Sequence, residues 1–115
     1  MKKLDVLKAL GALAQETRLD IFRYLVGIGA AGASAGQIAE HFGLPLPTLS
    51  FHLKTLQHAG LAQRTRQSRL LIYSANFTAI NAVLGYLTEN CCAGRPEDCG
   101  IPPPRKTRSP RKSSS

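Results

Sequence analysis

The chain has 115 residues, a formal net charge of +8 and a hydrophobic share of 43%, which limits it to one small domain with a single modest core. No apolar run is long enough to cross a membrane, and Asp5 and Lys8 interrupt the N-terminal stretch that would otherwise resemble a secretion signal. We therefore expect a cytoplasmic protein that has no membrane partner and whose thiols are kept reduced.

The acidic residues are distributed unevenly along the chain. No Asp or Glu occurs between Glu40 and Glu89. Four basic residues lie in this interval: Lys54, Arg64, Arg66 and Arg69. A segment that carries charge of one sign only indicates a polyanionic partner, most simply nucleic acid.

The first 27 residues predict two helices. Residues 4–14 have an apolar residue at every third position: Leu4, Leu7, Leu10 and Leu13. A helix this short is unstable alone in water, so it must pack against something. Residues 15–27 have a broad apolar arc, typical of a central core helix, made of Leu19, Ile21, Phe22, Leu25 and Val26. We expect Arg18, Asp20 and Arg23 to be solvated, and residues 27–36 to form a loop.

Residues 34–60 have the pattern of a helix-turn-helix. Ser34 and Gln37 form a capping box at the start of the first helix, and Gly43 suits its C-terminal end. In the second helix, which starts at Leu46, three leucines form an inward stripe: Leu49, Leu53 and Leu56. The opposite face has no carboxylate and consists of Pro47, Thr48, Ser50, Phe51, Lys54 and Gln57. Such a face suits the major groove of DNA, although a solvated face that merely lacks acids would look the same.

A β-hairpin and a last helix are predicted next. The runs 61–66 and 69–75 are β-prone, with a turn at Gln67-Ser68. A basic hairpin after a helix-turn-helix is typical of a wing, and three arginines would contact phosphates or a minor groove: Arg64, Arg66 and Arg69. Asn76 caps the last helix, whose apolar stripe is Phe77, Ile80, Val83, Leu84 and Leu87. The fold class is therefore mainly α with a small β-hairpin, a winged helix-turn-helix.

Three stretches together resemble the ArsR/SmtB family of winged-helix metalloregulators, over about residues 4–92. These are ALAQETRLDIFRYL, LPLPTLSFHLKTLQHAGL and RTRQSRLLIYS. The resemblance implies a homodimer, formed by the first and last helices, that binds an inverted repeat in operator double-stranded DNA and releases it when a toxic metal or metalloid binds. It places Thr48, Ser50, Phe51 and Lys54 in the groove and Arg66 and Arg69 at the wing contact. For His52 we expect a packing or hydrogen-bonding role.

The sequence departs from the family pattern at four places. Residues 35–50 contain no cysteine, so the family's Cys-x-Cys arsenic site on the reader helix is absent. The last helix offers only Glu89 as an acid and no histidine, which supplies a four-ligand zinc site poorly. Ser68 stands where the wing turn of the family usually has glycine, and Pro45 replaces a usual polar cap.

The cysteines are the remaining candidates for an effector site. Cys91, Cys92 and Cys99 fall within nine residues, and three thiolates without an imidazole select a soft ion. Arsenite, As(III), or antimonite, Sb(III), forms a three-sulfur complex, and the set resembles the C-terminal arsenic sites of some family members. Methylarsenite, which needs two thiols, is an alternative ligand. Thiol oxidation or cysteines with no function are the other readings.

These expectations divide the chain into three parts. Residues 1–92 form the winged helix-turn-helix DNA-binding and dimerisation domain, residues 93–100 form a loop that completes the cysteine site, and residues 101–115 form a basic, Pro/Ser-rich disordered tail. We expect an arsenite-responsive transcriptional repressor and not an enzyme, because no acid/base pair or phosphate loop is present. The alternatives are a repressor of the same fold that responds to methylarsenite or to thiol oxidation, and a DNA-binding protein without a ligand.

Overall fold

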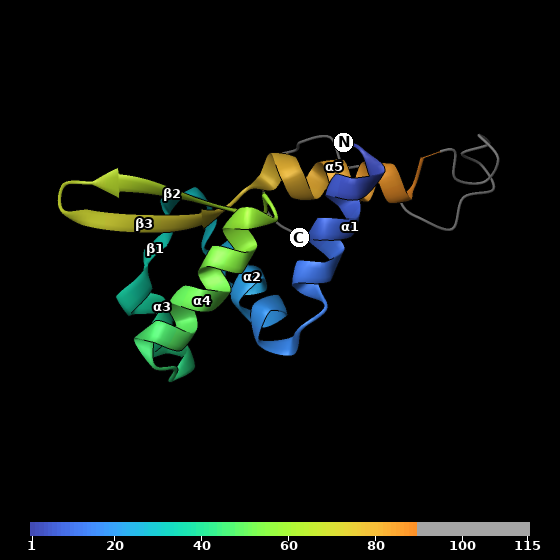
Figure 1. Ribbon diagram of the computed structural model, residues 1–115. Helices are drawn as coiled ribbons and strands as arrows, with labels where there is room; N and C mark the ends of the chain where they lie inside the picture. The colour runs from blue at the N-terminus through green and yellow to red at the C-terminus, as the bar shows by residue number, and fades with distance from the viewer. Residues whose placement is uncertain (90–115) are drawn as a thin grey trace.

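The computed structural model describes residues 1–89 of the chain. This part contains five α-helices and a small three-stranded sheet (Figure 1). The elements in chain order are α1 (Lys3–Leu13), α2 (Glu16–Ile28), a 3-10 turn (Gly29–Ala31), β1 (Ala33–Ser34), α3 (Ala35–Phe42), α4 (Leu46–His58), β2 (Ala62–Gln67), β3 (Leu70–Ala75) and α5 (Phe77–Leu87). The expected fold class, mainly α with a β-hairpin, is confirmed.

The outer helices and the hairpin lie at opposite ends of the molecule. Helices α1 and α5 lie at one end of the molecule, the β2–β3 hairpin projects at the other, and α2, α3 and α4 lie between them (Figure 1). The sheet is antiparallel with strand order β1-β3-β2, and Gln67 pairs with Leu70, which leaves Ser68 and Arg69 as the turn. The turn thus lies one residue later than the Gln67-Ser68 that the sequence predicted, because β2 continues through Gln67.

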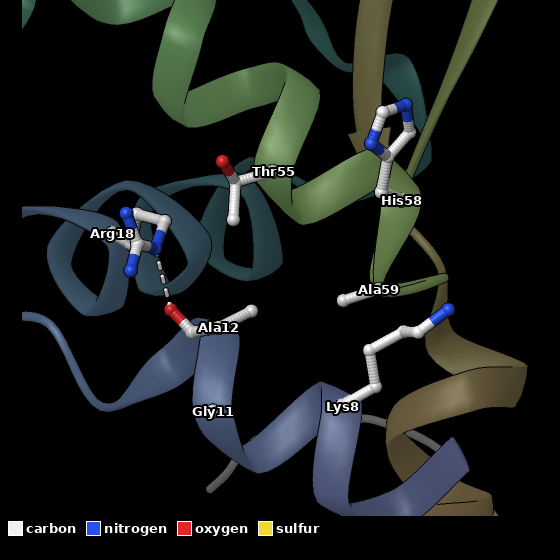
Figure 2. Close-up of a pocket in the computed structure, with 7 residues that line it drawn as sticks. All are labelled: Lys8, Gly11, Ala12, Arg18, Thr55, His58 and Ala59. Atoms are coloured by element: carbon white, nitrogen blue, oxygen red, sulfur yellow. Dashed lines mark hydrogen bonds between the residues drawn. The ribbon is translucent and has the colours of Figure 1, made fainter. Parts of the chain in front are cut away.

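A partly buried polar contact links α1 and α2. Nε of Arg18 donates a 2.8 Å hydrogen bond to the carbonyl oxygen of Ala12, in the last turn of α1 (Figure 2). The oxygen would otherwise have no partner within the helix, because the last carbonyls of a helix lack one. The side chain of Gln15 caps α2 by accepting from the amide of Arg18.

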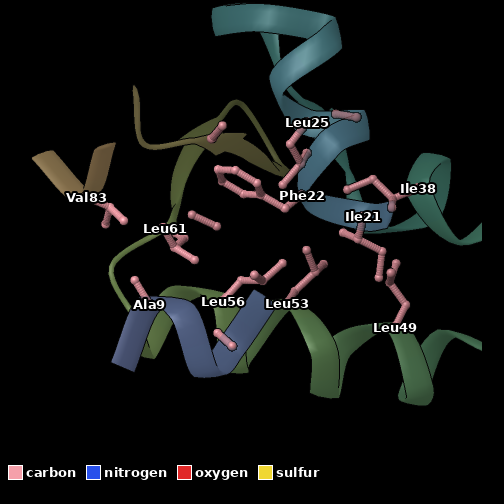
Figure 3. Close-up of a cluster of buried hydrophobic side chains, with 14 of the residues drawn as sticks. Ala9, Ile21, Phe22, Leu25, Ile38, Leu49, Leu53, Leu56, Leu61 and Val83 are labelled. Carbon is pink, nitrogen blue, oxygen red and sulfur yellow. The ribbon is translucent and has the colours of Figure 1, made fainter. Parts of the chain in front are cut away.

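The core lies where α2 and α4 face each other and the hairpin begins. Figure 3 shows Leu49, Leu53 and Leu56 of α4 pointing toward α2, and all three are buried, as their spacing predicted. Their buried partners include Ile21 and Leu25 of α2. Complete burial of these side chains stabilises the domain by about 2 kcal/mol each.

The predicted helix caps are present. Ser34 and Gln37 form the expected capping box, and Gly43 has φ = 65° at the end of α3. Asn76 accepts from the amide of Ala79 and also donates to the carbonyl oxygen of Gly60, so it ties the start of α5 to the end of the α4 segment.

The expectation of a loop over residues 27–36 was wrong. Helix α2 continues to Ile28, and β1 follows the 3-10 turn and pairs with β3, with Ala33 opposite Tyr73. Gly32 makes this pairing possible. It has φ = +69°, and a Cβ at this position would lie 2.5 Å from the carbonyl oxygen of Tyr73.

The apolar stripes of the two outer helices face the core only in part, through Leu13 of α1 and Ile80 and Val83 of α5. In α1 the buried residues are Val6, Ala9 and Ala12, whereas the leucine stripe is exposed: Leu4, Leu7 and Leu10. In α5 only Ala79 and Val83 are buried, and Phe77, Leu84 and Leu87 are exposed. Leu19 and Val26 of the central helix α2 are exposed too. Periodicity identified these apolar faces but not the surface that each one contacts.

No helix among residues 1–89 is long and apolar enough to cross a membrane.

Candidate nucleic-acid interface

Helix α4 carries the predicted reader face, and α3 and the turn after it lead into this helix. Helix α4 buries its leucine stripe, so its other side faces solvent. All four predicted reader residues are exposed: Thr48, Ser50, Phe51 and Lys54. The ring of Phe51 packs edge-on against His52 but leaves 63% of the residue exposed, which is unusual for a large apolar side chain.

The hairpin adds a basic projection next to α4. Arg64, Arg66 and Arg69 are all exposed. Arg64 and Arg66 are two residues apart on β2, so they point to the same face of the hairpin. Arg69 lies in the turn itself, and Nε of Arg66 lies 3.4 Å from the carbonyl oxygen of Ser68. The three guanidinium groups therefore extend along the hairpin to its tip.

All seven predicted residues are exposed, on a helix and a hairpin that follow each other in the chain. The exposed face of α4 and the hairpin belong to a segment without any acidic residue between Glu40 and Glu89. Hydroxyl, aromatic and ammonium groups on a helix can contact base edges and thymine methyl groups, and guanidinium groups on a wing can contact phosphates. These side chains are therefore of the types that bind double-stranded DNA.

Sequence reasoning missed the role of Arg18, which we expected to be solvated. Besides its bond to Ala12, its Nη1 lies 3.4 Å from Nδ1 of His52 on α4. His52 is half-buried, and its hydrogen-bonding role was predicted. Burial, and secondly the positive charge of Arg18, hold the pKa of His52 below its usual value of 6.5. Periodicity gave no sign of this contact, because the two residues are 34 positions apart.

Helices α1 and α5 expose a second kind of surface. Leu4 and Leu7 of α1 are 77% and 55% exposed, and Leu84 and Leu87 of α5 are 54% and 55% exposed. The two helices lie together at one end of the molecule (Figure 1). Large aliphatic side chains exposed on two neighbouring helices are typical of an interface with another protein.

The candidate metal ligands Cys91, Cys92 and Cys99 lie outside the described residues, as do residues 93–100 and the tail at 101–115. Within residues 1–89, no three metal-binding side chains gather in one place.

Comparison with known proteins identifies the class. A family model described as a helix-turn-helix domain matches residues 13–64. The transcriptional repressor SdpR of Bacillus subtilis is 32% identical over 76 residues, which cover 66% of this chain and 81% of SdpR. The HTH-type transcriptional regulator YgaV of Escherichia coli is 31% identical over 83 residues, which cover 72% of this chain and 82% of YgaV. An ArsR-like transcriptional regulator from Rhodococcus sp. RHA1 matches with a TM-score of 0.68 and 26% identity, over 79% of this chain and 82% of that one.

The chain belongs to the ArsR family. As an ArsR-family transcriptional regulator, it has the winged helix-turn-helix that the resemblance implied. The helix-turn-helix match begins at the end of α1 and ends within β2, so it contains all of the reader helix α4.

Proposed function

We propose that this ArsR-family regulator is a transcriptional repressor that binds operator double-stranded DNA as a homodimer. One observation carries the proposal: the exposed face of α4, whose other face is packed into the core, has no acid and continues into an arginine-bearing hairpin. A helix held firmly on one side and exposed on the other is the form in which helix-turn-helix proteins present side chains to the major groove.

Each part of this surface has a distinct role in the proposal. Thr48, Ser50 and Phe51 read base edges, with the ring of Phe51 placed against a thymine methyl group. Lys54 and the hairpin arginines bind phosphates, which fixes the register of the protein on the duplex. The sequence preference of the protein would therefore come from α4, and the salt dependence of binding from the hairpin and Lys54.

The second subunit covers the exposed leucines of α1 and α5. Burial of a leucine side chain contributes about 2 kcal/mol, so an interface centred on Leu4, Leu7, Leu84 and Leu87 provides a strong driving force for association. A twofold dimer presents two reader helices to half-sites about one helical turn apart. The preferred operator is then an inverted repeat.

The DNA-binding proposal is tested by selecting binding sites from random duplex DNA. We expect an imperfect inverted repeat. Phe51→Ala should relax the preference at one base pair per half-site at a cost of about 1–3 kcal/mol, whereas Arg66→Gln should weaken binding to all sequences equally. Selection of no common sequence would contradict the repressor and favour a DNA-binding protein without sequence preference.

The proposed effector is As(III) or Sb(III), bound by Cys91, Cys92 and Cys99. The donor set supports it, because three thiolates match the three-sulfur coordination that As(III) adopts. The cysteines follow α5 in the chain, and α5 carries part of the proposed dimer surface. Effector binding there would change the dimer and so the spacing of the reader helices. A hundredfold loss of operator affinity requires about 2.7 kcal/mol of coupling, and DNA must weaken effector binding by the same factor.

The effector proposal is tested by titrating the operator complex with arsenite. Cys91→Ser, Cys92→Ser and Cys99→Ser should bind operator normally and lose release by arsenite. Release that persists in all three variants would remove the site. Release by methylarsenite in a variant that keeps two thiols would indicate a two-thiol effector, and release by a mild oxidant that dithiothreitol reverses would indicate thiol oxidation instead.

A further inference from the structure

A shallow hollow lies between α1, α2 and α4, at the C-terminal end of the reader helix. Its volume is about 380 Å³, and it is lined by Lys8, Gly11, Ala12, Arg18, Thr55, His58 and Ala59 (Figure 2). None of the lining residues is acidic. Two of them are cations, one from α1 and one from α2, and a third carries an imidazole at the C-terminal end of α4.

The polar groups of the hollow are suited to an anion. Arg18 has five N–H donors, and its contacts with Ala12 and His52 use two of them. The exposed ammonium of Lys8 supplies three more donors. Thr55 donates its hydroxyl hydrogen to the carbonyl oxygen of Phe51. The hollow therefore offers mainly donors on cationic groups.

Small residues leave the space open. The lining contributed by Gly11, Ala12 and Ala59 has no side-chain atom beyond Cβ, and a Cβ added at Gly11 would meet nothing within 4 Å. In the single chain, α1 therefore leaves the cationic groups accessible.

The hollow adjoins the reader face. Phe51, Lys54 and His58 are spaced i, i+3 and i+7 on α4, so they share one face of the helix. His58 thus belongs to the reader face and also lines the hollow. The hollow therefore lies beside the C-terminal end of the reader face, on the side of α1.

We propose that the hollow of Lys8, Arg18 and His58 binds a backbone phosphate of the operator, and that α1 therefore contacts DNA as well as the second subunit. This rests on the proposed function. Lys8 and Arg18 supply the charge, and each half of the dimer contributes one such contact. The contact adds affinity without base specificity, because phosphates carry no sequence information.

The test measures operator affinity as a function of salt concentration for Lys8→Gln. Each phosphate contact contributes about 0.9 to the slope of log K against log salt, so the loss of one contact per subunit should reduce the slope by about 2. Lys3→Gln is the matched control, since it removes the same charge from the same helix and Lys3 is exposed and does not line the hollow. Equal slopes for the two variants would overturn the proposal.

Phosphate ethylation gives an independent readout. Ethylation of one phosphate per half-site should weaken operator binding by the wild-type protein but not by Lys8→Gln. The same set of sensitive phosphates for both proteins would contradict the assignment. Failure of the proposed function would give a different result from failure of this contact, because the wild-type protein would then select no operator at all. Normal operator selection with an unchanged slope for Lys8→Gln removes only the hollow.

Discussion

The guanidinium of Arg18 lies 3.4 Å from Nδ1 of His52, and its Nε is bonded to the carbonyl oxygen of Ala12. One side chain on α2 thus contacts the last turn of α1 and the middle of the reader helix α4. Helix α1 also carries exposed leucines at the proposed dimer surface. Arg18 therefore contacts both the helix that bears this surface and the reader helix.

Stability should depend on pH through His52. The pKa of His52 is lower in the folded protein than its usual 6.5, so below pH 6.5 the unfolded chain binds more protons. The folded state favours the neutral imidazole of His52. The contribution of this group to the free energy of unfolding is therefore complete above pH 6.5 and is lost as the pH falls through the folded-state pKa. Urea unfolding between pH 8 and pH 5 should show this decrease. In His52→Asn the decrease should be smaller, and in the control His41→Asn it should persist. An identical decrease in wild type and His52→Asn would exclude His52 as its source.

Substitution of a leucine on the exposed face of α1 should separate the subunits. Leu7→Lys places a charge where the second subunit would cover an apolar side chain, and a buried unpaired charge is strongly unfavourable. Because Leu7 is 55% exposed in the single chain, the monomer should still fold. Sedimentation velocity should show a monomer for Leu7→Lys and a dimer for the control Leu46→Lys, whose leucine is 52% exposed on α4. A dimeric Leu7→Lys would place the interface elsewhere.

Two glycines near each other in sequence should respond oppositely to alanine. Gly32→Ala should destabilise the domain by about 3 kcal/mol, because φ is +69° and the new Cβ would lie 2.5 Å from the carbonyl oxygen of Tyr73. Gly27→Ala should be neutral or stabilise by up to about 1 kcal/mol, since it lies in α2 and a Cβ there meets nothing within 4 Å. Denaturant midpoints measure both, and equal midpoints would contradict the close contact of Gly32 with β3.

The hairpin turn should become more stable when Ser68 is replaced by glycine. Ser68 has φ = 57°, a conformation that costs an L-residue about 1–2 kcal/mol. Glycine removes this cost but gains about 0.4–1 kcal/mol of unfolded-state freedom, so the net stabilisation should be about 0.5 kcal/mol. Ser50→Gly, in the exposed interior of α4, should instead destabilise by a similar amount. A lower urea midpoint for Ser68→Gly than for wild type would show that serine makes a stabilising contact in the turn.

The order of the five helices and the hairpin, the helix caps and the exposed side of α4 were determined by the sequence alone. The positions of Ser34, Gln37, Gly43 and Asn76 specify where helices start and end through local hydrogen bonds and φ angles, and the spacing of the α4 leucines specifies which side of that helix is buried. These signals act over a few residues, so they do not depend on which other elements pack against the segment.

Only the tertiary structure decided what each apolar or charged side chain contacts. The leucines of α1 and the apolar residues of α5 have the periodicity of core residues, yet most are exposed. Helix α1 packs instead through Val6, Ala9 and Ala12, and α5 packs through Ala79 and Val83. Arg18 likewise looked like a surface charge, and its contact with His52 required α2 and α4 to meet across 34 positions of sequence. Periodicity reports that a face is apolar or polar; which surface covers it depends on the chain folded as a whole.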